Sequence, residues 1–569
     1  MSAKWNLKDL FKSDEDLKLK LEILKKDALS FRENYENNLK KSDIFGEIIQ
    51  KYEQILEDLT LVMTYAFLCF AGDTSKGSFY ASCEKECKEI EENLLFFELE
   101  FCELDEDLAK KIIDENKSYS FYLSNLLKNK KHNLSKKEER IMLFLSSTGA
   151  EAFSRLFDES LTKIKVKFEG KKLGIEEILS KLYSKDRNER KKAAKNFSKK
   201  LKKNSDLLAY ILNMIRAELK TISKLRSYEN AEQRRHISNQ ISQKSVDSLI
   251  KVSEENFAIV AKYYKKKKQI LGFNELKDYD RYAPIGKDFS LSYEKAKDIV
   301  LKAFYDFSDV FGDIAKEAFE KNWIDVYPDS KKRGGAFSHS AVKKAHPYIL
   351  LNYTNKRRDL FTLAHELGHS IHQKLSYNVS FLNQDTPLTT AETASVFAEM
   401  LIFDYIKKDL KADELIGLYA AKIEDIFATL FRQINFTTFE RRIHSIENEL
   451  SVDEISKIWY EEGSKMFKDS VKLSKDYRYW WAYIPHFIHS PFYCYAYSYA
   501  QLLVLALYGL YKNKDKDFKD KYIKMLSSGG SKAPNELISD FGFNVDSEDF
   551  WKIGMKEIEK LVNEFMELR

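Results

Sequence analysis

Proline and glycine are scarce in this chain, and that scarcity limits the folds open to it. The 569 residues include only seven prolines and nineteen glycines. An all-β protein of this length would need many more turn residues, so we expect a mainly α-helical fold. The length also exceeds what one compact core usually contains, so several subdomains are expected.

Amphipathic helices are predicted along most of the chain. Residues 47–71 and 91–112 repeat apolar side chains at three- and four-residue steps. Residues 160–174 alternate briefly around Glu169-Gly170, which favours a small β-hairpin. We expect an N-terminal helical region at 1–180 and a second domain at 181–569. The most apolar segment, 501–511, is too short to span a bilayer and is interpreted as a core helix.

The composition argues against several classes of partner. The chain has 94 basic and 89 acidic residues, and the lysine run at 263–270 has acidic neighbours, so neither a nucleic-acid surface nor a membrane anchor is predicted. The N-terminal residues show no apolar signal segment, which favours a cytoplasmic protein. A reducing compartment is also indicated by the cysteines, which are odd in number and lack metal-finger spacing: Cys69, Cys83, Cys87, Cys102 and Cys494. The sequence does not determine the oligomeric state.

Helical periodicity fails between residues 327 and 354. Gly334-Gly335 predicts a tight loop, and the segment PYILLNYT (347–354) predicts a short strand. The helix that follows contains RDLFTLAHELGHSIHQKL (358–375). We interpret the strand as an exposed sheet edge on which an extended peptide can pair, with Gly334, Gly335, Tyr348 and Leu350 contacting the substrate.

The helix at 358–375 carries the pattern H-E-x-x-H. His365 and His369 project from nearly one line a turn apart, so both imidazoles can reach one zinc ion. Glu366 points partly off that line and can act as a general base on a metal-bound water. Six apolar residues lie on the opposite side from His365, His369 and His372, which predicts one packed face and one polar face: Leu360, Leu363, Ala364, Leu367, Ile371 and Leu375.

A catalytic zinc needs a third protein ligand and an open position. His372 is one candidate, although three ligands on one straight helix rarely converge on one metal. Asp385 and Glu392 are the others. We favour Glu392, with Glu399 two turns further along the same face as a residue that orients a zinc ligand. Glu392 could equally serve a capping box with Thr389.

Several segments in order resemble peptidase family M3, specifically its oligoendopeptidase F branch. They span most of the chain: WNLKDLF, KRGGAFS, LLNYT with DLFTLAHELGHSIH, PLTTAETASVFAEML, FRQINFTTFE, IPHFIHSPFYCYAYSYA and SSGGSKAPNEL. The resemblance implies a multi-helical zincin-like peptidase with a small sheet beside the H-E-x-x-H helix and a deep substrate channel walled by the N-terminal region. It implies one Zn²⁺ per chain, with His365, His369 and Glu392 as its ligands.

The resemblance also implies a second group of residues that bind substrate and stabilise the oxyanion. His486 holds the matching position, and Tyr493 and Tyr497 are the candidate donors. His489 stands where an aromatic residue is expected, which leaves both histidines as candidates. Tyr495 lies on the alternating side and is a lesser candidate that could contact the substrate.

The implied activity is zinc-dependent cleavage of internal bonds in short unstructured oligopeptides, with folded proteins excluded. Two alternatives stay open. A carboxypeptidase of similar build would need a cation such as Arg333 or Arg478 to bind the substrate's free carboxylate. A non-catalytic peptide-binding protein would hold a structural zinc, with His372 as the nearest fourth ligand.

Overall fold

The computed structural model describes residues 4–513 and 516–568, and it is mainly helical, as predicted. The chain forms two compact units, each built from three separate segments. Unit 1 contains residues 1–131, 289–408 and 514–541, and unit 2 contains residues 132–288, 409–513 and 542–569. The division predicted at residue 180 falls inside unit 2, so it does not coincide with a boundary between the units.

Unit 1 contains thirteen α-helices among its described residues, and a three-stranded sheet. The helices are α1 (Asp14–Tyr35), α2 (Phe45–Gly72), α3 (Gly77–Glu91), α4 (Phe96–Glu103), α5 (Glu106–Glu115), α6 (Ser120–Asn129), α14 (Tyr293–Phe307), α15 (Asp309–Glu320), α16 (Arg357–Ser376), α17 (Leu388–Ala391), α18 (Thr393–Ile406), α24 (Phe518–Ser527) and α25 (Pro534–Ser539). The strands are β3 (Ile324–Asp325), β4 (Phe337–His339) and β5 (Tyr348–Leu350).

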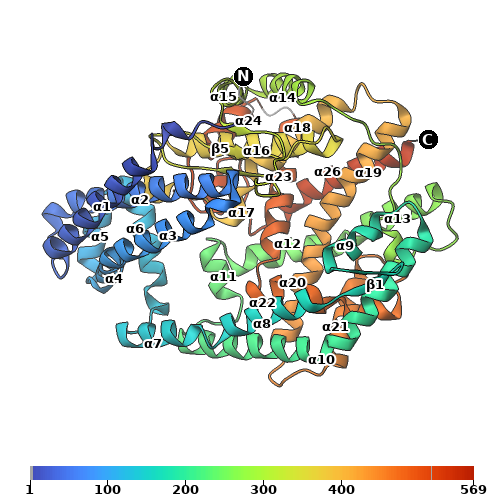
Figure 1. The fold of residues 1–569 in the computed structure, drawn as a ribbon, viewed down its shortest axis with the longest axis horizontal. Coiled ribbons are helices and arrows are strands. Elements are labelled where there is room, and N and C mark those ends of the chain that lie inside the picture. The colour runs from blue at the N-terminus through green and yellow to red at the C-terminus, as the bar shows by residue number, and fades with distance from the viewer. Residues whose placement is uncertain (1–3, 514–515, 569) are drawn as a thin grey trace. The chain divides into compact units, whose positions relative to one another are not determined.

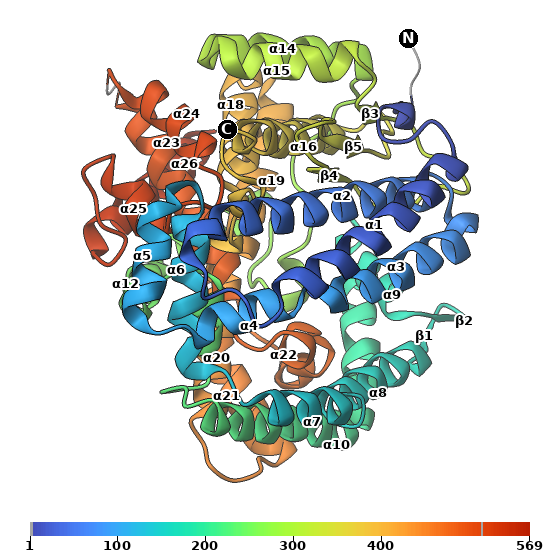
Figure 2. The same cartoon turned by 90° about the vertical axis from the view of Figure 1, so that its left-hand side faces the viewer.

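Helices α1 to α6 share one hydrophobic core, and α1, α2 and α3 pack side by side in it (Figure 1, blue; Figure 2). Helix α2 is long and apolar enough to cross a membrane by length and composition alone. However, 56% of its apolar window is buried inside the protein. Packing in this core therefore accounts for much of its apolar character.

The sheet of unit 1 has the order β3-β5-β4. Strand β5 pairs in parallel with β3 and antiparallel with β4, so it is the central strand. The predicted exposed edge at residues 348–350 is therefore wrong. Tyr348 and Leu350 are fully buried, and Tyr348 packs against Trp5 and His346. The near-continuous apolar run of this strand is what a strand covered on both faces requires.

Helix α16 is held by its apolar side. The side chains predicted to form its packed face are all buried, and each buried leucine contributes about 1.5–3 kcal/mol relative to an exposed one. Helix α18 approaches it closely, because a Cβ at Gly368 would lie 2.6 Å from the carbonyl oxygen of Ala394. Helices α14 and α15 lie along the same pair (Figure 2). The glycine of the H-E-L-G-H segment thus brings the two helices together.

Unit 2 contains thirteen α-helices among its described residues, and a two-stranded hairpin. The helices are α7 (Lys136–Ser146), α8 (Ala150–Lys163), α9 (Ile175–Ser180), α10 (Arg187–Leu225), α11 (Gln233–Ser238), α12 (Gln243–Glu255), α13 (Phe257–Ile270), α19 (Ala412–Thr429), α20 (Phe431–His444), α21 (Val452–Lys465), α22 (His486–His489), α23 (Tyr495–Lys512) and α26 (Glu548–Glu567). Two 3-10 segments, η8 (Asp278–Asp280) and η10 (Lys475–Tyr483), also belong to this unit.

Two local predictions in unit 2 are confirmed. Strands β1 (Val166–Phe168) and β2 (Lys171–Leu173) form the expected hairpin, with Glu169 and Gly170 at φ 46° and 79° in the turn. The apolar segment 501–511 lies within α23, which is almost entirely buried and packs on α26. This segment is a core helix.

Candidate active site

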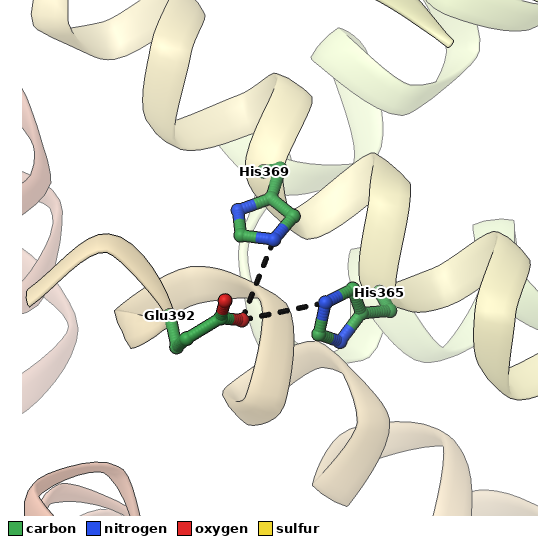
Figure 3. Close-up of side chains that lie close together, drawn as sticks. All are labelled: His365, His369 and Glu392. Atoms are coloured by element: carbon green, nitrogen blue, oxygen red, sulfur yellow. Dashed lines mark ion pairs between the residues drawn. The ribbon is translucent and has the colours of Figure 1, made fainter. Parts of the chain in front are cut away.

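His365 and His369 lie on α16, and Glu392 lies where α17 ends and α18 begins. The Nε2 atoms of His365 and His369 are 3.3 and 3.4 Å from the Oε2 atom of Glu392 (Figure 3). One ligand atom from each of the three side chains lies within 4.8 Å of the other two. Among the described residues, this is the single group of three or more His, Cys, Asp or Glu side chains with that geometry.

The three side chains fit a zinc ion. Zinc binds histidine nitrogen and carboxylate oxygen at about 2.0–2.2 Å in a tetrahedral arrangement, which separates neighbouring ligand atoms by roughly 3.3 Å. The two distances to Glu392 match that separation. Burial would raise the pKa of Glu392, but its hydrogen bond with His369 and the nearby imidazoles outweigh burial and lower the pKa to about 2. The carboxylate is therefore charged and ready to bind a cation.

Three side chains were candidates for the third zinc ligand, and of these only Glu392 lies next to His365 and His369. Helix α17 has no side-chain cap, and Glu392 is itself the first cap residue of α18, so the predicted capping box with Thr389 is wrong. His372 is buried and lies outside the metal-binding group. Asp385 does not join the group either.

Glu399 holds His365 in place. Its Oε1 atom lies 2.6 Å from Nδ1 of His365, which leaves Nε2 of that ring directed toward Glu392. Burial would lower the pKa of His365, but the hydrogen bond to Glu399 and the surrounding carboxylates raise it to about 9. A carboxylate on the far nitrogen fixes the ring orientation and increases the basicity of a metal-binding histidine.

Glu366 follows His365 on α16 and is buried. Burial raises its pKa, and the charges of His365 and His369 only partly offset that effect. A carboxyl group whose pKa is raised toward neutrality is better matched to accept and return a proton near pH 7. This environment suits the predicted general base.

A second group of side chains lies in unit 2, on α22, on α23 and in the turn between them. The rings of His486 and Tyr493 are stacked with centroids 5.9 Å apart, and Nε2 of His486 lies 3.3 Å from the hydroxyl of Tyr497. All three side chains are partly exposed. His489 is not part of this group, and its Nε2 atom lies 2.9 Å from Oδ1 of Asp158 on α8.

Tyr495 is separate from this second group. It is fully buried, and its hydroxyl lies 2.9 Å from both Nδ1 of His236 and Nδ2 of Asn239. The expectation that Tyr495 contacts substrate is wrong in this conformation, as it is for buried Tyr348 and Leu350. Gly334 and Gly335, by contrast, lie in an exposed loop before β4, and Gly335 has φ 85°.

Three residues that contact the candidate site residues or the backbone beside them were not predicted from the sequence. Ser395 donates its hydroxyl to Glu392 at 2.7 Å. Glu440 is fully buried and accepts a hydrogen bond of 2.8 Å from the backbone N–H of Phe492, which has φ 59° just before Tyr493. Arg235 lies 5.6 Å from the ring centre of Tyr493. Ser395 and Glu440 lie in the segments AETAS and FTTFE, which belong to the stretches that resemble family M3, so the resemblance could have indicated them.

Comparison with known proteins identifies the class. The model of peptidase family M3 matches residues 180–557, and that of oligopeptidase F matches residues 100–165. The chain therefore belongs to peptidase family M3, and it is a metalloendopeptidase.

Two named relatives agree with this assignment, and a solved structure shares the fold. An oligoendopeptidase F homolog of Borreliella burgdorferi is 30% identical over 98% of both chains. The oligopeptidase PepF of Bacillus subtilis is 28% identical, over 99% of this chain and 87% of its own. A peptidase of Chlamydophila abortus shares the fold with a TM-score of 0.91, at 23% identity over 100% of this chain and 99% of its own.

Proposed function

We propose that this protein is a zinc-dependent oligoendopeptidase that cleaves internal bonds of short, unstructured peptides. The observation that carries the proposal is the meeting of His365, His369 and Glu392 around one point on a helix that also presents Glu366. A structural zinc site has no need of a buried carboxyl group beside its ligands. The printed names of the relatives, which are oligopeptidases, support the substrate class.

We assign one zinc ion per chain to His365, His369 and Glu392. When bound, it supplies a Lewis acid for the scissile carbonyl and lowers the pKa of a water molecule to about 7. Glu366 takes the proton of the attacking water and returns it to the leaving amine. General-base assistance of this kind contributes about 10² to 10⁴-fold.

We assign oxyanion stabilisation to the second group. Tyr497 and Tyr493 offer phenol hydrogens, and His486 holds Tyr497 through its hydrogen bond. Burial and the charge of Arg432 lower the pKa of His486, which keeps this imidazole neutral near pH 7. A neutral imidazole and two phenols stabilise a developing negative charge without adding a fixed one.

Two further proposals concern substrate access and location. Strands β3 and β4 are the two edges of the described three-stranded sheet, and we propose that an extended peptide adds to β4 rather than to the central β5. The exposed glycines Gly334 and Gly335 lead into that strand. A cytoplasmic location is supported by the five cysteines, which are free and buried in the described structure.

The proposal is tested with a short, internally quenched peptide blocked at both ends. The zinc-loaded protein should cleave it, the chelated protein should not, and readdition of zinc should restore cleavage. A carboxypeptidase would leave this peptide intact and cleave only the version with a free C-terminus. A folded protein containing the same sequence should resist. Zinc binding without cleavage of either peptide would favour a non-catalytic peptide-binding protein.

A further inference from the structure

Unit 2 contains a small cavity that is not lined by His486, Tyr493 or Tyr497. It lies between α20, α21 and η10, and α20 and α21 pack side by side (Figure 1, orange). The side chains that line it include Arg281, Arg432, Asn435, Trp459 and Tyr477. Two arginine side chains therefore line one small space, and no carboxylate residue lines it.

Several hydrogen-bond donors around the cavity lack a good acceptor. Nε of Arg432 is buried and has no hydrogen-bond partner among the described residues. Its terminal nitrogen reaches only the hydroxyl of Tyr483, at 3.4 Å. The amide of the buried Asn435 donates to the sulfur of Met466 at 3.5 Å, and a thioether is a weak acceptor. Buried donors without a good acceptor are costly, so an acceptor is expected in this space.

The carboxylate of Asp278 acts on Arg281 through space only, without a direct contact between the two charged groups. Within the described structure, neither Arg281 nor Arg432 forms an ion pair. Arg281 is buried and donates to the backbone carbonyl of Asp278 and to the hydroxyl of Tyr282. The carboxylate of Asp278 instead accepts two hydrogen bonds from Ser474.

The effect of this charge is visible on a neighbouring phenol. Burial would raise the pKa of Tyr282, but the guanidinium groups of Arg281 and Arg432 outweigh burial and bring the pKa below its ordinary value. The two guanidinium groups therefore act on the same buried region. Buried charges of this kind are normally paired with a counter-charge.

The size of the cavity limits its occupant. It leaves about 10 Å³ for the centre of a water-sized molecule, which is room for about one such molecule or a single monatomic ion. Phosphate, sulfate and a peptide carboxylate are too large. A water molecule would fit but would leave the positive charge unbalanced.

We propose that this cavity is a binding site for a small monovalent anion of the chloride class, held between Arg281, Arg432 and Asn435. The buried rings of Trp459 and Tyr477 also line the site, and an apolar lining strengthens the attraction between an anion and the arginines. The anion is a resident counter-ion of unit 2. Its binding does not depend on the assignment of peptidase activity.

The test uses the full-length, zinc-loaded protein. Its thermal unfolding is followed in sodium chloride and in sodium gluconate at equal ionic strength, because gluconate is too large for the cavity. We expect chloride to raise the midpoint by roughly 1–3 °C in a saturable manner. Crystals grown in sodium bromide should show an anomalous peak in the cavity.

Variants decide whether the effect arises at this site. Arg432→Gln should lose the chloride-specific shift, and Asn435→Leu, which nearly preserves volume, should weaken it even if Arg432→Gln folds poorly. Arg442→Gln is the matched control on the same helix, because its guanidinium is paired with Glu461 and Glu462. It should keep the full shift. The proposal is overturned if chloride gives no specific shift, if Asn435→Leu keeps it undiminished, or if the cavity holds only water.

Discussion

The metal-binding group of unit 1 and the aromatic group of unit 2 are assembled in different ways. His365 and His369 are one helical turn apart, and a single close helix contact, at Gly368, brings the segment carrying Glu392 to them. His486, Tyr493 and Tyr497 surround an irregular turn in which Phe492 has a positive φ. Glu440 of α20 stabilises that turn by accepting a hydrogen bond from the backbone N–H of Phe492.

The two groups also differ in charge. The first gathers carboxylates around imidazoles, with Glu399, Glu392 and Glu366 all close to His365. The second presents neutral donors beside two arginines, Arg235 and Arg432. A carboxylate-rich site attracts a cation, whereas neutral donors in a positive surrounding favour developing negative charge. The comparison supports our proposal that the first group binds the metal and the second stabilises the oxyanion.

The largest expected effect is loss of the metal. His369→Ala removes one of three ligands, so the protein should lose zinc and all detectable cleavage of the blocked peptide. Zinc content is measured by atomic absorption after gel filtration. His372→Ala is the matched control. Loss of this buried side chain should lower the free energy of unfolding, while the zinc content should stay near one per chain. Equal zinc loss in both variants would contradict the ligand assignment.

Removal of one oxyanion donor should have the next largest effect. Tyr497→Phe is expected to lower kcat by about 10² to 10³-fold with zinc content unchanged. Tyr495→Phe is the comparison two residues away. It removes a buried hydroxyl that contacts His236 and Asn239, so it should lower the free energy of unfolding by about 1–3 kcal/mol and leave kcat nearly unchanged. If Tyr495→Phe lowered kcat and Tyr497→Phe did not, Tyr495 rather than Tyr497 would be the oxyanion donor.

Loss of the residue that orients His365 should have a smaller effect. Glu399→Ala removes the carboxylate 2.6 Å from Nδ1 of His365. Zinc affinity should fall by about 10 to 100-fold, as measured by competition with a fluorescent chelator. With saturating zinc, most of the activity should return. Unchanged affinity would show that His365 is oriented by its packing alone.

The smallest effect is expected at the second histidine of IPHFIH. His489→Ala breaks an exposed pair with Asp158, and pairs of this kind contribute about 0–1 kcal/mol. Cleavage should stay within about twofold of the wild type. His486→Ala, in the same short helix, should instead lower kcat markedly. If His489→Ala proved the more damaging change, the assignment of these histidines would be reversed.

The two histidines of the first group could be predicted from local geometry, whereas the choice of Glu392 came from the resemblance to family M3. A one-turn spacing places His365 and His369 together in any α-helix, and the nearby carboxylate of Glu392 needed only one helix contact. The hairpin around Gly170 was predictable for the same reason, since turn chemistry acts within a few residues.

Features that depend on contacts between segments far apart in the sequence could not be predicted from local patterns. Whether β5 is central or at the edge depends on β3 and β4, and nothing in its own apolar run determines which strands flank it. The burial of His372 depends on the elements packed around α16 and not on its own helical position. The interleaved units also join segments far apart in the chain, so composition around residue 180 could not reveal them.

The most direct test of the account is the kcat of Glu366→Gln on the blocked peptide, with zinc content measured in the same sample. Glutamine keeps the shape of the side chain and removes its capacity to accept a proton. We predict one zinc per chain and a kcat lower by about 10² to 10⁴-fold. A variant that retains zinc and cleaves within about tenfold of the wild-type rate would contradict the assignment of Glu366 as the general base.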